Sequence, residues 1–152
     1  MARLLARSAE AEDVVQDAFV EAFRDLDRLQ DPSAFGRWLQ RVAVHQVHRR
    51  FRRRRLLRAL GLDRGEDDLS LAEQADPGAG PDVLAELAEL DRVLDRLSPE
   101  RRVAWMLRYV EGQTLDEVAE ACGRSLATIK RLIAAAQREI AAHMAIPRWE
   151  DE

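Results

Sequence analysis

Hydrophobic positions recur along most of the chain with a helical period, while strand-like alternation is absent and β-branched residues are few. The first such segment begins near Glu12. Its apolar positions come in pairs every four residues: Val14, Val15, Ala18, Phe19, Ala22 and Phe23. This spacing predicts an amphipathic helix whose other faces are acidic. We therefore expect an all-α fold.

A second helix is predicted from about Ala34 towards Leu57, after a break at Asp31-Pro32. Proline suits the first turn of a helix, because the amide it lacks would have no partner there. The apolar face of this helix comprises Phe35, Trp38, Leu39, Val42, Ala43, Val47 and Phe51. Its other faces carry arginine and histidine.

The periodicity stops between Gly61 and Pro81, where glycine, proline and acidic residues predict a linker, with a short helical turn at Leu69–Ala75. A leucine-rich stripe then predicts a helix from Pro81 to Leu97. Ser98-Pro99-Glu100 predicts the start of another helix, which ends near Gly112.

The segment Leu115–Leu132 has the spacing of a helix-turn-helix. Thr114 and Glu117 form a capping box, Gly123 suits a left-handed turn, and Ser125 caps a last helix that reaches about Ala145. Small Ala119 allows the two helices to cross closely, and the core side of the motif comprises Val118, Ile129 and Leu132. An ordinary helical hairpin with a polar face is the alternative.

The second helix of this motif would present polar side chains to a DNA major groove. The candidates are Arg124, Ser125, Thr128, Lys130 and Arg131. Arginine and lysine bind guanine edges or phosphates, and the hydroxyls can do either.

Charge is strongly segregated along the chain, although the net charge is only -4. No acidic residue occurs from Pro32 to Leu62, and this stretch contains Arg37, Arg41, Arg49, Arg50, Arg52, Arg53, Arg54, Arg55 and Arg58. Such a block between acidic segments indicates a polyanion site on a protein that has other partners as well. Aromatic side chains beside it could stack on bases, whereas Trp38 alone could equally be a core residue.

Several classes of function are not supported by the residues. The single cysteine, Cys122, excludes an intrachain disulfide, and we expect it to pack inside the helix-turn-helix. His45 and His48 lack a third ligand for a metal. No phosphate loop or nucleophile motif occurs, so we expect no enzyme, no catalytic residue, no cofactor and no small-molecule substrate. No apolar run approaches the roughly 18–20 residues of a membrane span, and Met1–Arg7 does not resemble a secretory signal, so we expect a cytoplasmic protein.

Two blocks of sequence resemble the sigma-70 family of RNA polymerase sigma factors, in its ECF (extracytoplasmic function) group. Ala11–Arg24 and Phe35–Ala43, with the arginine-rich tail that follows, resemble region 2. Leu97–Val103 and Thr114–Ile129 resemble region 4, including its Ser-x-x-Thr-x-Lys signature at Ser125, Thr128 and Lys130. The resemblance implies two small helical domains joined by a flexible linker: a region 2 bundle at 1–59, the linker at 60–81, a region 4 helix-turn-helix at 82–146 and a tail at 147–152.

The resemblance also implies partners and roles. Docking on the β′ clamp helices of the polymerase core would use Asp13, Gln16, Asp17 and Phe19. Promoter -10 DNA would be bound by Leu29, Asp31, Ser33, Phe35, Trp38, Arg41, Arg49, Arg50, Arg52 and Arg53. Region 4 would bind the β flap, and the -35 element through Arg124, Ser125, Thr128, Lys130 and Arg131. An anti-sigma factor that masks both domains is a further expected partner.

The sequence departs from the family pattern at a few places. Only Arg3–Arg7 remains of a helix that normally precedes the acidic one, so we expect the apolar face of the Val14–Phe23 helix to be incompletely covered. His45 replaces a usual asparagine, and Arg124 occupies a turn position that is usually apolar. Two other functions stay open: a stand-alone helix-turn-helix regulator, and a sigma-like decoy that binds an anti-sigma factor.

Overall fold

The computed structural model describes residues 8–61 and 75–144, with side chains from Glu12 onwards. Within these residues the chain forms α-helices and short 3-10 helices and no strand. The elements in chain order are α2 (Ser8–Arg24), η1 (Leu26–Arg28), η2 (Pro32–Ala34), α3 (Phe35–Ala59), α4 (Pro81–Arg96), α5 (Pro99–Tyr109), α6 (Leu115–Cys122) and α7 (Leu126–His143). The all-α prediction is confirmed. The segments expected at Arg3–Arg7, at 147–152 and in most of Leu69–Ala75 lie outside the described residues.

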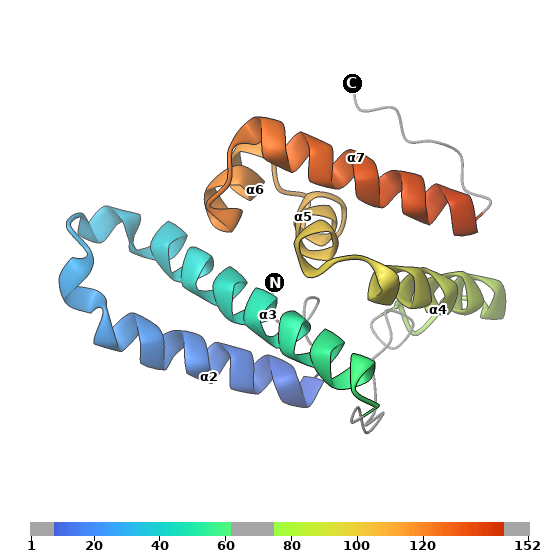
Figure 1. The fold of residues 1–152 in the computed structure, drawn as a ribbon, viewed down its shortest axis with the longest axis horizontal. Helices are drawn as coiled ribbons and strands as arrows, with labels where there is room; N and C mark the ends of the chain where they lie inside the picture. Colours follow the sequence, from blue (N-terminus) through green and yellow to red (C-terminus); the bar gives the residue numbers. More distant parts are fainter. Residues whose placement is uncertain (1–7, 62–74, 145–152) are drawn as a thin grey trace.

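Helices α2 and α3 form an antiparallel pair joined by η1 and η2 (Figure 1). Along α2 one line of small apolar side chains, Val14, Ala18 and Ala22, is buried. The neighbouring line is not, and Phe23 is 82% exposed. Among the described residues, the apolar face of α2 is therefore only partly covered by other side chains, as predicted.

Helices α4 to α7 form the second half of the molecule, in which α5 lies between α3 and α7 (Figure 1). Each predicted cap is present. The Ser98 and Ser125 hydroxyls accept from the backbone N–H groups of Arg101 and Thr128, and Thr114 and Glu117 form the capping box. Gly123, with φ +60°, ends α6 in the left-handed conformation that glycine adopts at least cost.

The helix-turn-helix core is packed as its spacing predicts. Val118 and Ile129 are fully buried, Ala119 and Cys122 are nearly so, and Leu132 packs against the same cluster. The thiol of Cys122 is therefore a core group, and burial raises its pKa to about 11.

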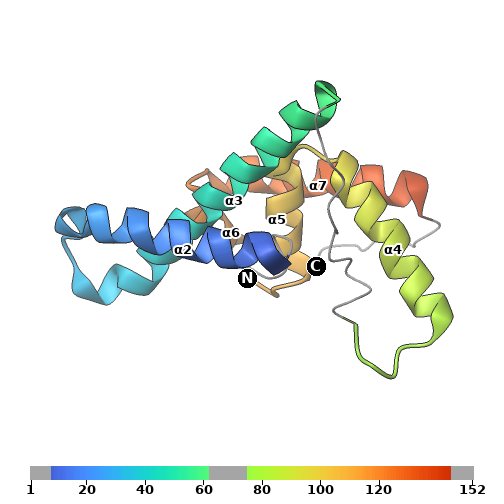
Figure 2. The same cartoon turned by 90° about the horizontal axis from the view of Figure 1, so that it is seen from below.

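Helix α3 is buried on two sides, which differs from the single apolar face predicted for it. Val44 and His48 are buried in addition to the predicted Val47 and Phe51, whereas Phe35 remains exposed. One side of α3 contacts α2 and the other contacts α5 and α6. α3 thus lies between α2 and the pair α5 and α6 (Figure 1), and seen from below it runs diagonally across α2 (Figure 2). The second buried face of α3 could not be predicted from the sequence, because arginines and histidines surround Val44 and His48.

The two halves share one hydrophobic cluster. Val44, Val47 and Phe51 of α3 belong to the same buried set as Leu97 and Val103. We refer to the contact between α3 and the α4–α7 half as the seam.

Candidate nucleic-acid interface

The first two turns of α7 present an exposed polar surface. Ser125, Lys130 and Arg131 are exposed, and Thr128 is half-buried. The Ser125 and Thr128 hydroxyls lie 2.9 Å apart, and the Arg131 guanidinium approaches the Thr128 hydroxyl at 3.4 Å. The helix-turn-helix therefore places four of its five predicted -35 residues on one accessible end of α7.

Arg124, the fifth residue of that set, faces the other way. Its guanidinium donates to the Glu100 carboxylate at 2.8 Å and lines a pocket against His48 of α3. The structure thus separates Arg124 from the other predicted -35 residues and pairs it with an acid at the seam.

The residues predicted for -10 DNA fall into three groups, and the first lies at the loop between α2 and α3. Asp31 accepts from the Ser33 backbone N–H at 2.9 Å and from its hydroxyl at 2.8 Å. These two bonds hold the pKa of the Asp31 carboxyl below its ordinary value. Phe35 and Trp38 form a tilted ring pair 6.1 Å apart, and Leu29 lies half-buried before them. The loop therefore has its own hydrogen bonds and an aromatic border.

The second group lies in a groove between α2 and α3. Arg49, Arg50 and Arg53 line this groove together with acidic side chains of α2. Arg50 pairs with Asp13 at 3.4 Å and with Asp17 at 3.0 Å. A second cross-link joins the helices where Gln46 donates to Glu21. The arrangement brings part of the predicted polymerase-docking patch into direct contact with a predicted DNA-binding arginine.

The third group, Arg41 and Arg52, lies on the opposite side of α3, at the seam. A Cβ at Gly123 would lie 3.7 Å from Nε of Arg41, and Arg52 lines the pocket beside Arg124. Nearby, Arg37 pairs with Glu120 of α6 at 3.5 Å. Helical geometry divides the basic block in this way, because residues 41 and 52 share a face that residues 49 and 53 do not.

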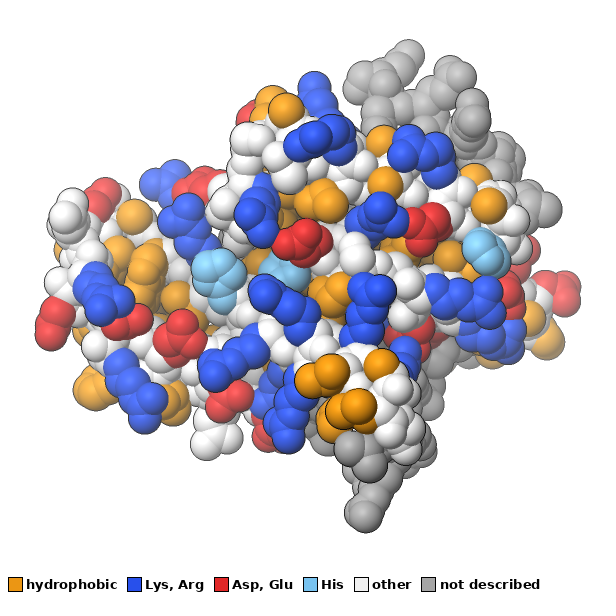
Figure 3. All heavy atoms as spheres, in the orientation of Figure 1, with side chains coloured by type: hydrophobic (Ala, Val, Ile, Leu, Met, Phe, Trp, Pro, Cys, Tyr) orange, Lys and Arg blue, Asp and Glu red, His pale blue; other side chains and the backbone are white. Residues whose placement is uncertain are grey.

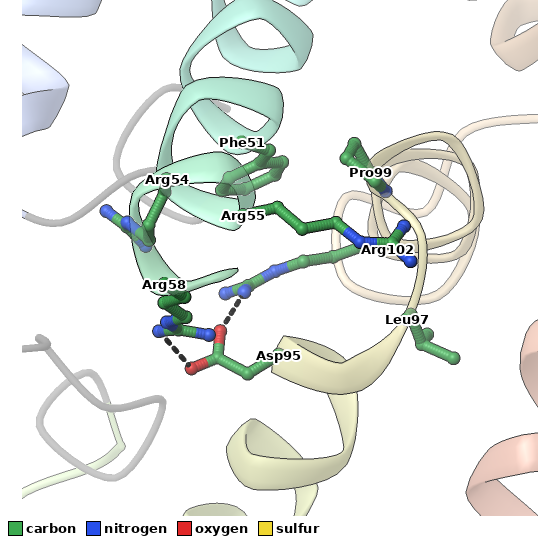
Figure 4. A pocket seen from close by; sticks show the side chains of 8 residues that line it. All are labelled: Phe51, Arg54, Arg55, Arg58, Asp95, Leu97, Pro99 and Arg102. Atoms are coloured by element: carbon green, nitrogen blue, oxygen red, sulfur yellow. Dashed lines mark hydrogen bonds and ion pairs between the residues drawn. The ribbon is translucent and has the colours of Figure 1, made fainter. Parts of the chain in front are cut away.

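A charged cluster that the sequence did not indicate closes the other end of the seam (Figure 4). Asp95 of α4 accepts from Arg58 of α3 at 3.1 Å and from Arg102 of α5. The Arg102 guanidinium also lies 4.7 Å from the centre of the Phe51 ring. Burial alone would raise the pKa of Asp95, but the Arg102 and Arg58 charges outweigh it and lower that pKa. No local pattern could have identified this cluster, because Arg58 of α3 lies 37 positions from Asp95 in the sequence.

An apolar groove of about 420 Å³ lies at the α2–α3 loop, beside the first group. It is lined by exposed aromatic and aliphatic side chains, including Phe19, Phe23, Leu26 and Phe35. Phe19, predicted to dock on polymerase, thus adjoins Phe35, which is predicted to bind -10 DNA.

Among the residues that the structure describes, no cluster of three or more His, Cys, Asp or Glu side chains could hold a metal ion. None of the described helices is long and apolar enough to cross a bilayer.

Comparisons with known proteins cover both halves of the chain. The family profile of Sigma-70 region 2 matches residues 1–56, and that of Sigma-70 region 4 matches residues 87–140. The chain is 29% identical over 143 residues to the ECF RNA polymerase sigma factor SigE of Mycolicibacterium smegmatis, with 94% of the chain and 55% of SigE covered. It is 30% identical over 138 residues to the RNA polymerase sigma factor NccH of Alcaligenes xylosoxydans xylosoxydans, with 88% of the chain and 73% of NccH covered.

A solved structure supports the same likeness. CnrH in complex with the cytosolic domain of CnrY superposes with a TM-score of 0.58 at 25% identity, over 93% of this chain and 75% of the solved one. The chain spans little more than half the length of SigE.

Proposed function

Because this chain belongs to the ECF group of the sigma-70 family, we propose that it brings RNA polymerase core to promoters and initiates transcription there. Sigma factors are not enzymes, and the proposal extends this to the present chain: it contributes binding surfaces and no catalytic residue. The proposal also assigns the chain to the cytoplasm, where its polymerase partner works.

One observation carries this proposal: region 2 and region 4 occur in family order, and each carries the surface that its role requires. Region 2 presents exposed acids on α2, and region 4 presents exposed basic residues at the start of α7. An acidic patch suits a protein partner, whereas exposed Lys130 and Arg131 suit a polyanion. A stand-alone regulator would have no use for the first surface.

The docking role falls to the exposed side of α2. In the proposal Asp13, Gln16 and Asp17 bind the β′ clamp helices, and Phe19 adds apolar contact beside them. All four side chains are exposed, which is what a protein partner needs.

The -10 role falls to the α2–α3 loop and to α3. Leu29, Asp31, Ser33, Phe35 and Trp38 would capture the unpaired strand, since aromatic rings stack on bases. Arg49, Arg50 and Arg53 would hold the nearby backbone. Arg41 and Arg52 are also exposed and would add backbone contacts from the side of α3 that faces α6 and the turn after it.

The -35 role falls to the exposed end of α7. Ser125, Thr128, Lys130 and Arg131 would contact the major groove, while region 4 also binds the β flap. Arg124 joins this set once its pairing with Glu100 is released.

An anti-sigma factor is the remaining proposed partner. CnrH was solved with CnrY, and the chain superposes on CnrH over most of its length. The exposed apolar groove at Phe19 and Phe23 offers such an inhibitor a hydrophobic contact.

The test is promoter-dependent transcription with reconstituted core polymerase, with and without this chain, on fragments of its own genome. The proposal expects discrete transcripts that require the chain. Duplex binding without any effect on polymerase would favour the stand-alone regulator. A folded chain that stays inactive on suitable promoters, also when extended upstream of Met1, would favour the decoy.

A further inference from the structure

A polar pocket lies in the seam, between α3 and the helix-turn-helix. It holds about 220 Å³ and is lined by His45, His48 and Arg52 of α3, Glu100 of α5, Arg124 of the turn and Leu132 of α7. Figure 3 shows histidine and arginine side chains gathered over the line where α3 meets the other half, next to an acidic one. Both halves of the molecule therefore contribute to one small cavity.

The charge in this pocket is not balanced. Two guanidiniums face a single carboxylate, and that carboxylate already pairs with Arg124. Arg52 has no carboxylate partner among the described residues. A pocket with this excess of positive charge has a positive potential that favours an anion.

His48, which also lines the pocket, has an unsatisfied hydrogen-bonding nitrogen. Its side chain is only 7% exposed, yet its Nδ1 has no hydrogen-bond partner in the described part of the chain. A buried polar nitrogen without a partner is costly, so a ligand atom at this place would be stabilised. Burial, and then the charges of Arg52, His45 and Arg124, lower the pKa of His48 to about 4, while Glu100 opposes them.

We propose that this pocket binds the phosphate group of a small molecule, inorganic phosphate or a phosphate monoester. Arg52 and Arg124 provide the charge-assisted hydrogen bonds, and the Nδ1 of His48 donates once it carries a proton. A phosphate group offers several acceptor oxygens to donors from different directions, and the cavity has room for it.

Binding at this place would hold the two halves together. The ligating groups come from α3 on one side and from the turn between α6 and α7 on the other. The phosphate would also occupy Arg52 and Arg124, so it would compete with promoter DNA for these two arginines. This step rests on the proposed function, but binding itself does not.

The histidines allow a direct test on the full chain. Only three are present, and His143, at the far end of α7, bonds to the Glu139 carbonyl and serves as an internal reference. Histidine-labelled protein is titrated by NMR with inorganic phosphate, and with sodium chloride at equal ionic strength. We expect phosphate to shift the His48 resonance in a saturable manner and to raise its pKa by about one unit or more, with no change at His143.

Matched variants locate the binding. Arg52→Gln should weaken the phosphate response at least about tenfold, in keeping with the loss of a charge-assisted bond. Arg53→Gln, which changes the same residue type in the groove on the other side of α3, should leave it intact. The proposal would be overturned if the His48 resonance did not shift with phosphate. It would also be overturned if both variants lost the phosphate response to the same extent.

A third arm separates the possible sources of phosphate. Dimethyl phosphate reproduces the diester of a nucleic-acid backbone and lacks the second negative charge of inorganic phosphate at neutral pH. A response to inorganic phosphate that exceeds the response to dimethyl phosphate supports a small ligand. An equal or stronger response to dimethyl phosphate would overturn it in favour of a nucleic-acid backbone. None of these readouts involves polymerase, so their failure leaves the proposed function untouched.

Discussion

The guanidinium of Arg50 on α3 lies 3.0 Å from the carboxylate of Asp17 on α2 and also reaches Asp13 at 3.4 Å. Two surfaces to which different partners are assigned therefore share a contact. If α2 docks on polymerase as proposed, a partner that competes for the two carboxylates would release Arg50 towards DNA, and polymerase docking would then be coupled to the availability of a backbone contact.

Charge reversal of the two acids separates the sigma factor from a stand-alone regulator. The double variant Asp13→Arg/Asp17→Arg should abolish binding to core polymerase, with a loss of about a hundredfold or more, because repulsion replaces attraction. Duplex DNA binding should persist. Fluorescence anisotropy with labelled core measures the first, and gel shift the second.

The matched control for this variant is Asp82→Arg/Glu86→Arg, which changes the same charge at exposed positions of α4 before the region 4 match begins. It should bind polymerase normally. If the α2 variant also did so, the docking assignment would be wrong.

The capping box should make a measurable contribution to stability. Thr114→Ala removes the acceptor for the Glu117 backbone N–H and should cost about 1 kcal/mol in the free energy of unfolding, measured by urea denaturation. Thr114→Ser keeps the hydroxyl and should recover most of this loss. The bonds from Thr114 also lower the pKa of Glu117, so their contribution is present near neutral pH and is lost as the carboxyl becomes protonated in acid.

The thiol of Cys122 should react slowly in the native chain. Burial raises its pKa from 9.0 to about 11, against a smaller lowering by the Arg124 charge and with a still smaller raising contribution from Glu100. The two-unit change lowers the thiolate fraction at pH 8 about a hundredfold. Alkylation followed by mass spectrometry should therefore be at least that much slower than in urea, and equal rates would show that the seam opens freely.

The stability of the chain should fall as the pH drops from about 6.5 towards 4. His48 has a pKa near 4 in the folded chain and 6.5 as its ordinary value, so in this range only the unfolded chain takes up the proton. The free energy of unfolding should fall by about 3 kcal/mol in total, with the full loss reached near pH 4 and none above pH 7. The groups that face His48 are Arg52 and His45 on its own helix, Glu100 of α5, and Arg124 and Cys122 of the helix-turn-helix.

Urea denaturation at pH 7, 6 and 5, in buffers without phosphate, measures this dependence. His48→Gln should flatten it over this range, while His143→Gln should leave it unchanged. An unchanged slope in the His48 variant would mean that another group causes the decline.

Local signals predicted the helices of the second half well. Thr114, Gly123 and Ser125 determine where α6 and α7 begin and end, because caps and left-handed turns depend on neighbouring residues only. The start of α4 at Pro81 is equally local. The family and the types of its surface residues followed from the same short segments.

Long-range relationships could not be predicted in this way. The sequence suggested that Val44 and His48 lie on a polar face, since arginines surround both, yet both are buried against α5 and α6. Arg58 pairs with Asp95, which lies 37 positions further along the sequence. Hydrophobic periodicity predicts contacts within one helix and cannot predict a pair so far apart. The orientation of Arg124 towards Glu100 depends on the same packing.

The two buried faces of α3 also bear on how the chain folds. Val44, Val47 and Phe51 complete a cluster that includes Val103 and Ile129, so α3 contributes core to both halves. Neither half can lose its structure without exposing apolar surface of the other. Cooperativity therefore extends across the boundary between regions 2 and 4, and the closed chain should melt in one calorimetric transition although its family is defined by two separate segments.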